Sequence, residues 1–289
     1  TNNVFPLLEK ELSVKLGQKE INNNRITPEA AKRGLNAFHE LYEIVANHQV
    51  EKSVAVATSA LRSTTNGNQF IEQINQRFSV QVELISGEEE AECIYRGVKQ
   101  GGLNPPAPFL ILDIGGGSTE FIIADNQQWY WKKSFDLGIA RLLEWFQTSD
   151  PIRGKEIANV HQFISEKLAA YFEAIQTWQP NALIGCAGTF QTYRSMLHAK
   201  YPNTYPDSGT PPAIKMNQED FNGIHAELIH SKCQEREKMK GLKIYRVEMI
   251  VLASIFVNFI VEKSNIRHLY QSDYALKEGI IDKYITNKD

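Results

Sequence analysis

The segment from Asp113 to Glu120 combines the residue types that could bind a phosphate group. It reads Asp-Ile-Gly-Gly-Gly-Ser-Thr-Glu, with an apolar run on either side. Successive backbone amides in a glycine turn form a concave anion site, and Ser118 and Thr119 add hydroxyl donors. Asp113 and Glu120 would repel a bare phosphate, so they suggest a divalent cation between themselves and it. The segment therefore predicts a strand, a phosphate-binding turn and a second strand, because a plain hairpin has no need of these acids and hydroxyls.

Three other segments that could contact phosphate each follow a short apolar run. Thr58 to Arg62 brings a guanidinium and two hydroxyls together, a combination suited to a phosphate chain. Glu88 to Glu90 opens a helix, where favourable interaction with the helix dipole would by itself explain three acids. Gly185 to Thr189 is a glycine turn before a helix, a weak signal for anion binding at the helix N-terminus. All lie at strand ends, where α/β folds place ligands.

The elements that must position these side chains alternate between strand and helix. This order predicts an α/β protein in which helices cover each sheet. The glycine- and proline-rich stretch 101–108 is the best candidate linker. We therefore expect an N-terminal α/β domain at 1–100, joined by the C-terminal helix 274–289, and a second α/β domain at 101–273 that carries the glycine loop.

The local patterns give approximate element ranges. Thr27, Pro28 and Glu29 are typical of a helix start, and Asn66 is a candidate cap for a later helix. The expected strands are one or two within 4–16, then 53–57, 80–84, 109–112, 121–124, 129–135, 182–185 and 269–272. The expected helices are 28–47, one after 66, 88–98, 138–146, 151–172, 218–230, 247–262 and 274–285.

Composition narrows the class of partner. The 289 residues are 42% hydrophobic and 22% charged with a net charge of −3, which is typical of a soluble globular protein. The chain has no overall positive charge of the kind that would predict binding to nucleic acid or to a membrane surface. No apolar run in the sequence is long enough to span a bilayer. Three widely separated cysteines argue against a disulfide framework or zinc cluster and favour the reducing cytoplasm.

Taken in this order, the segments resemble the exopolyphosphatase/guanosine pentaphosphate phosphohydrolase (Ppx/GppA) family in its short two-domain form. The resemblance covers nearly the whole chain, and the pairing of Asp-Ile-Gly-Gly-Gly-Ser-Thr-Glu with the upstream Glu-Glu-Ala is specific. It implies two ribonuclease-H-like domains around a central cleft, the actin/sugar-kinase/Hsp70 ATPase superfold. The matching segments are 58–62 with Asn66, 85–91, 113–120, 134–142, 188–189, Arg246 with Glu248, and 272–279.

The resemblance also implies an activity and residue roles. The activity is hydrolysis of a terminal phosphoanhydride of polyphosphate or of a (p)ppGpp-type nucleotide, with Glu90 as the catalytic group that activates water. The implied cofactor is Mg²⁺ or Mn²⁺, held by Asp113 and Glu120. A homodimer is left open. The implied phosphate ligands are Arg62, Gly115, Gly116, Gly117, Ser118, Thr119, Gly188 and Thr189.

Two departures from the family pattern keep alternatives open. The family opens with another phosphate loop, of which Thr1 and Asn2 are the only candidate trace; we expect it to be missing only from the printed sequence. Lys277 and Glu248 stand where the family usually has Arg and Asp. One alternative is an ATP-dependent small-molecule kinase or ATPase of the same superfold. The other, if the loop is truly absent, is a non-catalytic polyphosphate- or alarmone-binding protein.

Overall fold

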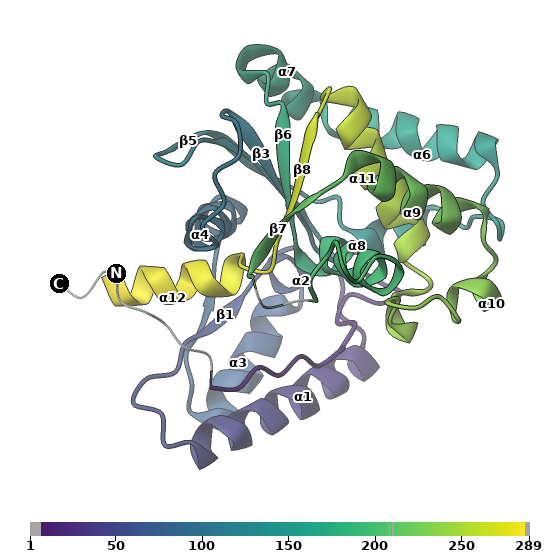
Figure 1. The fold of residues 1–289 in the computed structure, drawn as a ribbon. Coiled ribbons are helices and arrows are strands. Elements are labelled where there is room, and N and C mark those ends of the chain that lie inside the picture. The colour runs from purple at the N-terminus through teal and green to yellow at the C-terminus, as the bar shows by residue number, and fades with distance from the viewer. Residues whose placement is uncertain (1–6, 208, 210, 287–289) are drawn as a thin grey trace. The chain divides into compact units, whose positions relative to one another are not determined.

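The computed structural model describes residues 7–207, 209 and 211–286 and shows two compact units (Figure 1). The first unit ends at Ile85 and the second begins at Ser86. This division assigns residues 86–100 and 274–289 to the second unit, whereas the sequence predicted the domains 1–100 with 274–289, and 101–273. The two helices in these stretches pack on each other and on the second unit's sheet, which accounts for the difference.

The first unit contains a small parallel sheet and a helical layer. Its elements are α1 (Pro28–Asn47), β1 (Ala55–Ala57), α2 (Ser59–Arg62), α3 (Gly67–Phe78) and β2 (Val82–Leu84). The strands β1 and β2 pair in parallel, with Ala55 opposite Val82. The predicted start of α1 is confirmed, because the Thr27 side chain accepts a hydrogen bond from the Ala30 amide at 3.1 Å and Pro28 follows it.

Two predictions for this unit are wrong in detail. Of the predicted strand region 4–16, residues 7–16 form no strand, because in the described part of the unit β1 and β2 pair only with each other. The Arg33 side chain instead donates hydrogen bonds to the carbonyls of Val14 and Lys15. Residues 4–6 lie outside the described residues. Asn66 precedes α3, but its side chain does not cap that helix. Its amide instead bonds to both backbone groups of Ile26, at 3.0 and 2.8 Å.

The second unit is built on a six-stranded sheet in the order β5-β4-β3-β6-β8-β7. The strands β3, β6 and β8 are parallel, so their carboxyl ends lie at one edge of the sheet. The sequence missed β7, which is short and follows a proline-rich loop. The bounds are β3 (Phe109–Ile114), β4 (Thr119–Ala124), β5 (Trp129–Phe135), β6 (Ala182–Cys186), β7 (Ala213–Met216) and β8 (His268–Ser272).

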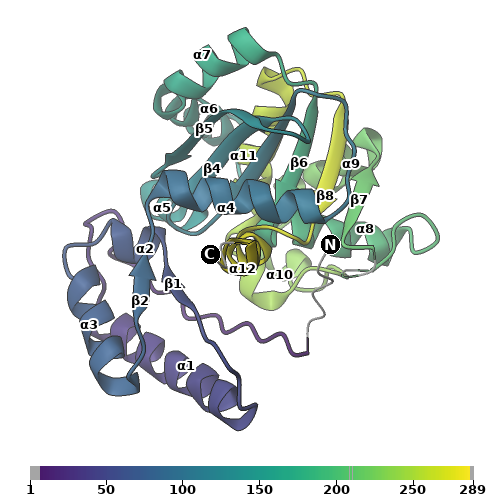
Figure 2. The ribbon, with the colours of Figure 1, turned by 90° about the vertical axis from the view of Figure 1, so that its left-hand side faces the viewer.

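Helices cover both faces of this sheet. The helices α4 (Gly87–Gln100) and α12 (Leu276–Thr286) lie on one face, on the left in Figure 1, and Figure 2 shows α4 crossing in front of the strands. The predicted long helix 151–172 is interrupted at Leu168, where the backbone leaves helical geometry while the side chain stays buried. The other helices are α5 (Ile139–Trp145), α6 (Gly154–Lys167), α7 (Ala169–Trp178), α8 (Ala187–Lys200), α9 (Gln218–His230), α10 (Cys233–Arg236), the 3₁₀ turn η1 (Ile244–Arg246) and α11 (Ile250–Lys263).

The structure also bears on the predictions for the apolar helix, the cysteines and membrane-spanning segments. The apolar helix predicted from residue 247 begins at Ile250 as α11 and is buried along nearly its whole length. Cys93, Cys186 and Cys233 are free thiols. Within the described ranges, no helix is long and apolar enough to cross a membrane.

Candidate active site

The glycine loop joins β3 to β4, and it is held in place by α5. The predicted strand, turn and strand are confirmed, with Ile114 opposite Thr119 where the turn begins. The Ile139 and Ala140 amides donate to the carbonyls of Gly115 and Gly116 at 3.0 and 2.9 Å. The buried Arg141 Nε donates to the Gly117 carbonyl at 2.8 Å. These contacts to α5 involve the carbonyl groups of the loop and leave out the backbone amides of Gly116 and Gly117.

The glycines of this loop do not require special backbone angles. None of the three has a positive φ. Among the described glycines, only Gly102, Gly209 and Gly241 have one. The tight position is Gly138, just before α5, where a Cβ would lie 2.3 Å from the Gly116 carbonyl carbon. Gly138 therefore permits the close packing that holds the loop.

We expect Gly138→Ala to destabilise the protein by about 1–3 kcal/mol and to displace the loop, because the added carbon meets backbone atoms that cannot rotate away. Thermal unfolding measures the change. The matched control is Gly223→Ala in α9, where a Cβ would meet nothing within 4 Å. The control should keep or raise stability, since alanine is the better helix former. Equal losses in both variants would contradict the role of Gly138.

Three carboxylates converge on the face of the sheet that α4 covers. Asp113 on β3 and Glu120 on β4 are direct cross-strand partners in an antiparallel ladder. On the same face, Ile111 and Ile122 pack in the core cluster under α4. Glu90 lies in the first turn of α4, and all three acids are less than one-tenth exposed. The structure thus brings together the predicted catalytic group and the two predicted metal ligands.

The electrostatics of the cluster reflect this crowding. Burial, and then the negative charge of Glu90, raises the pKa of Asp113 to about 7. Burial, Glu90 and Asp113 together raise the pKa of Glu120 well above its usual range, against the opposing effect of hydrogen bonds from Ser118 and Ser134. Carboxylates with raised pKa values in a shared site are typical of functional sites.

The three acids at the start of α4 have different surroundings. Glu88 is exposed. Glu89 completes a capping box with Ser86 and pairs with Lys283 at 3.1 Å. Only Glu90 is buried and interacts with Asp113 and Glu120. Dipole and capping effects therefore account for Glu89, while Glu90 needs another explanation.

The hydroxyls of the loop point to opposite faces of β4. Ser118 Oγ donates to Glu120 Oε1 at 2.6 Å, and Ser134 on β5 donates to the same oxygen at 2.7 Å. Thr119 Oγ1 donates to the Leu137 carbonyl at 2.6 Å, so it supports the turn before α5. The sequence did not select Ser134, Gly138 or Arg141 as site residues, although all lie in the family-like segment 134–142. The roles predicted for Ser118 and Thr119 in phosphate binding stay predictions.

The turn after β6 lies next to the glycine loop, because Cys186 is the register partner of Asp113. Ala187 has a φ of 59°, an unusual angle for a residue with a side chain, and it leads into Gly188. The Arg246 guanidinium lies against Gly188, where a Cβ would come within 1.7 Å of it. Thr189 is buried. The positively charged Arg246 side chain therefore lies beside the predicted anion contact at Gly188 and Thr189.

The remaining predicted residues have separate surroundings. Arg62 lies in the first unit, where its Nη1 donates to the Ile85 carbonyl at 3.1 Å. The neighbouring Ser59 hydroxyl is buried with no hydrogen-bond partner in the described structure. Lys277 is exposed and pairs with Glu278 at 3.3 Å, and Glu248 is exposed. Nothing in these contacts explains why Lys277 and Glu248 replace the usual residues.

The donor set fits a magnesium ion only in part. In the described part of the chain, no group of three or more His, Cys, Asp or Glu side chains could hold a metal on its own. Mg²⁺, however, often takes only one or two carboxylates and completes its shell with water and substrate phosphates. Asp113 and Glu120 supply two such carboxylates. Burial and the neighbouring carboxylates raise the pKa of both, and a bound cation would favour their ionised forms. The pair therefore fits Mg²⁺ or Mn²⁺ in the presence of a phosphate ligand.

Comparison with known proteins places the chain among enzymes of phosphate metabolism. It is 26% identical over 276 residues to "Exopolyphosphatase 2" of Mycobacterium tuberculosis, covering 92% of this chain and 85% of that protein. It is also 26% identical over 265 residues to the "Guanosine-5'-triphosphate,3'-diphosphate pyrophosphatase" of Vibrio cholerae, covering 90% of this chain but 50% of that longer protein.

Solved structures agree with this placement. The crystal structure of an exopolyphosphatase from Cytophaga hutchinsonii superposes with a TM-score of 0.90 at 32% identity, covering 98% of this chain and 90% of that one. The Aquifex aeolicus member of the Ppx/GppA family gives a TM-score of 0.76 at 23% identity, covering 96% and 88%. The predicted α/β fold is thereby confirmed. The model of the Ppx/GppA phosphatase family matches residues 2–288, and the chain belongs to that family.

Proposed function

We propose that this protein hydrolyses the terminal phosphoanhydride of inorganic polyphosphate or guanosine pentaphosphate. The observation that supports this most is the convergence of Glu90, Asp113 and Glu120 beside a loop whose carbonyls are turned toward α5. A phosphoanhydride hydrolase needs a base for water, donors for phosphate oxygens and a positive counter-charge. Glu90 would be the base, the loop amides would be the donors, and a cation held by Asp113 and Glu120 would be the counter-charge.

In the proposed reaction, Glu90 orients a water molecule and accepts its proton as the water oxygen attacks the terminal phosphorus. A new P–O bond forms, the bridging P–O bond breaks, and the products are orthophosphate and a chain shortened by one phosphate. The amides of Gly116 and Gly117 would bind the phosphate oxygens. The Ser118 hydroxyl would join them by exchanging its bond to Glu120 for one to phosphate. A cation held by Asp113 and Glu120 would offset the negative charge of the phosphoryl group.

Other predicted contacts extend this proposal along the substrate. Gly188 and Thr189, with Arg246 beside them, would contact phosphates beyond the terminal one. Arg62 stays a predicted phosphate ligand. Cytoplasmic location, a homodimer and the absence of nucleic-acid partners also remain predictions.

Phosphate release from polyphosphate and from guanosine pentaphosphate, measured side by side with Mg²⁺ or with EDTA, tests the function. We expect metal-dependent release of orthophosphate. Tight ATP binding with phosphoryl transfer to an acceptor, and no release from either substrate, would instead support a kinase. Calorimetric binding of polyphosphate without turnover would support a binding protein.

A further inference from the structure

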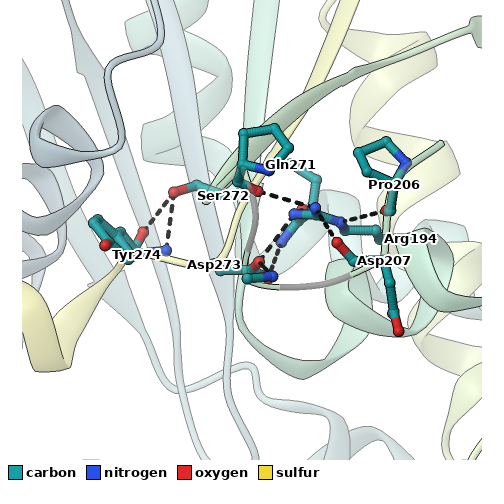
Figure 3. A network of polar contacts seen from close by, with 9 residues as sticks. Arg194, Pro206, Asp207, Gln271, Ser272, Asp273 and Tyr274 are labelled. Atoms are coloured by element: carbon teal, nitrogen blue, oxygen red, sulfur yellow. Dashed lines mark hydrogen bonds and ion pairs between the residues drawn. The ribbon is translucent and has the colours of Figure 1, made fainter. Parts of the chain in front are cut away.

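Arg194 on α8 is a fully buried arginine whose bonding groups all have partners. It is 0% exposed, and its side chain connects two segments that are far apart in sequence (Figure 3). One is the loop between α8 and β7; the other is the end of β8. It donates to the carbonyls of Pro206 (3.2 Å), Asp207 (2.5 Å) and Pro211 (2.9 Å), and to the side chains of Gln271 (3.1 Å) and Asp273 (2.9 Å).

Asp273 is the counter-ion in this network and fixes the chain as it leaves the sheet. Its carboxylate also accepts from Gln271 Nε2 and from the Gly209 amide, both at 2.8 Å, and its own amide donates to the Pro212 carbonyl at 2.8 Å. On either side of it, Ser272 Oγ bonds to the Tyr274 backbone at 2.7 and 3.1 Å (Figure 3). Every residue from 271 to 274 is therefore held by hydrogen bonds immediately before α12.

The start of α12 in turn determines where α4 can lie. A Cβ at Gly97 of α4 would be 1.8 Å from the Ala275 carbonyl oxygen, and a Cβ at Gly279 of α12 would be 1.7 Å from the Cys93 carbonyl oxygen. The two backbones are thus in direct contact, with no side chain between them to absorb a shift. Gly97 is about two helical turns, or roughly 10 Å, from Glu90 on the same helix.

We propose that Arg194 is a positioning residue for Glu90. Its ion pair with Asp273 fixes the turn before α12, and α12 fixes α4 through the two glycine contacts. All of these residues belong to the second unit. The inference rests on the proposed function, because it takes Glu90 to be the group that acts on water. It predicts a defect in turnover rather than in binding, since misplacing this carboxylate changes the transition state more than the bound substrate.

The test uses Asp273→Asn, which keeps the shape but removes the charge that Arg194 faces, and Arg194→Lys, which keeps the charge but loses the planar five-donor group. Ser272→Ala is a milder variant of the same turn, in case either of these fails to fold. Below the unfolding temperature, we expect kcat to fall by about 10-fold to 10²-fold while KM changes by less than about threefold. Amide hydrogen exchange in the first turns of α4 should become faster in the same variants.

Tyr205→Phe is the matched control. Tyr205 lies in the same loop and is buried, but its hydroxyl connects the loop to Asp220 and to the Asn217 amide rather than to β8. Its loss should lower stability without changing kcat or exchange in α4. Normal kcat and exchange in folded Asp273→Asn and Ser272→Ala would overturn the inference, as would an equal kcat loss in Tyr205→Phe. If the unmodified protein shows no Glu90-dependent phosphate release, the proposed function fails instead, and the exchange measurement still tests the connection between Arg194 and α4.

Discussion

Replacing Glu90 with Gln should lower kcat for phosphate release by about 10²-fold to 10⁴-fold, the usual contribution of a general base. The substitution keeps the size of the side chain and its ability to form hydrogen bonds, but it cannot accept a proton from water. The protein should stay folded, and near neutral pH its thermal stability should be unchanged or higher. The reason is that the Glu90 charge contributes to the raised pKa values of Asp113 and Glu120, and its removal relieves that repulsion.

The neighbouring Glu88 provides the control. It lies in the same first turn of α4 but is exposed, so Glu88→Gln changes the charge of the helix N-terminus without touching the buried cluster. Its kcat should stay within about twofold of the unmodified protein, since the helix dipole effect is small at the surface. Initial rates with polyphosphate and melting curves measure both properties. Full activity in Glu90→Gln or Glu90→Ala would remove Glu90 from the proposed mechanism.

Local chemistry made much of this site predictable. The loop 113–120 carries its strands, turn and acids within a few residues, and Thr27 and Pro28 specify the start of α1 in the same way. Alternating strands and helices gave the fold class, because the hydrophobic periods of the two elements differ. In each of these cases, the residues that determine the structure are close together in the sequence.

What could not be predicted depends on contacts between distant segments. Asn66 has the sequence signature of a helix cap, yet its amide bonds to Ile26, forty residues away in sequence. Gly138 matters because Gly116 and Gly117 pass directly beside it, and Ser134 matters because β5 pairs with β4 in the register that sets it opposite Glu120. Arg194 gave no signal, since an arginine in a helix is usually exposed.

The acid cluster also predicts how stability depends on pH. Asp113 has a pKa of about 7 in the folded protein and an ordinary value of 3.8 when unfolded. Below about pH 4 the group is protonated in both states and has no effect. As the pH rises, the unfolded chain ionises first, so stability is lost up to about pH 7, by about 4 kcal/mol for this group alone. Glu120, whose pKa is also raised, acts in the same direction.

As the pH rises from about 5 to 7.5 in EDTA, the melting temperature of the unmodified protein should therefore fall relative to that of Asp113→Asn. The comparison with the variant is needed because burial also lowers the pKa of His161 and His225, which makes stability rise with pH in the lower part of this range. Carboxylates with lowered pKa values, such as Glu92 and Asp150, act in the opposite direction, but only at more acidic pH. Asp125→Asn is the control, because Asp125 also has a lowered pKa and lies outside the cluster; this variant should keep the slope above pH 5. An unchanged slope in Asp113→Asn would contradict the raised pKa.

Mg²⁺ should reverse this loss if Asp113 and Glu120 hold the cation. A cation binds the ionised carboxylates of the folded protein and stabilises that state by mass action, increasingly so as the pH rises and the acids ionise. The increase in melting temperature with Mg²⁺ should therefore be small near pH 5 and large near pH 7.5, and it should be lost in Asp113→Asn. An increase that is independent of pH, or that survives in this variant, would place the cation elsewhere. Inorganic phosphate, present at the same concentration in every sample, supplies the phosphate ligand that the two carboxylates need to complete the cation's shell. Because the measurement needs no turnover, it tests the metal site separately from catalysis by Glu90.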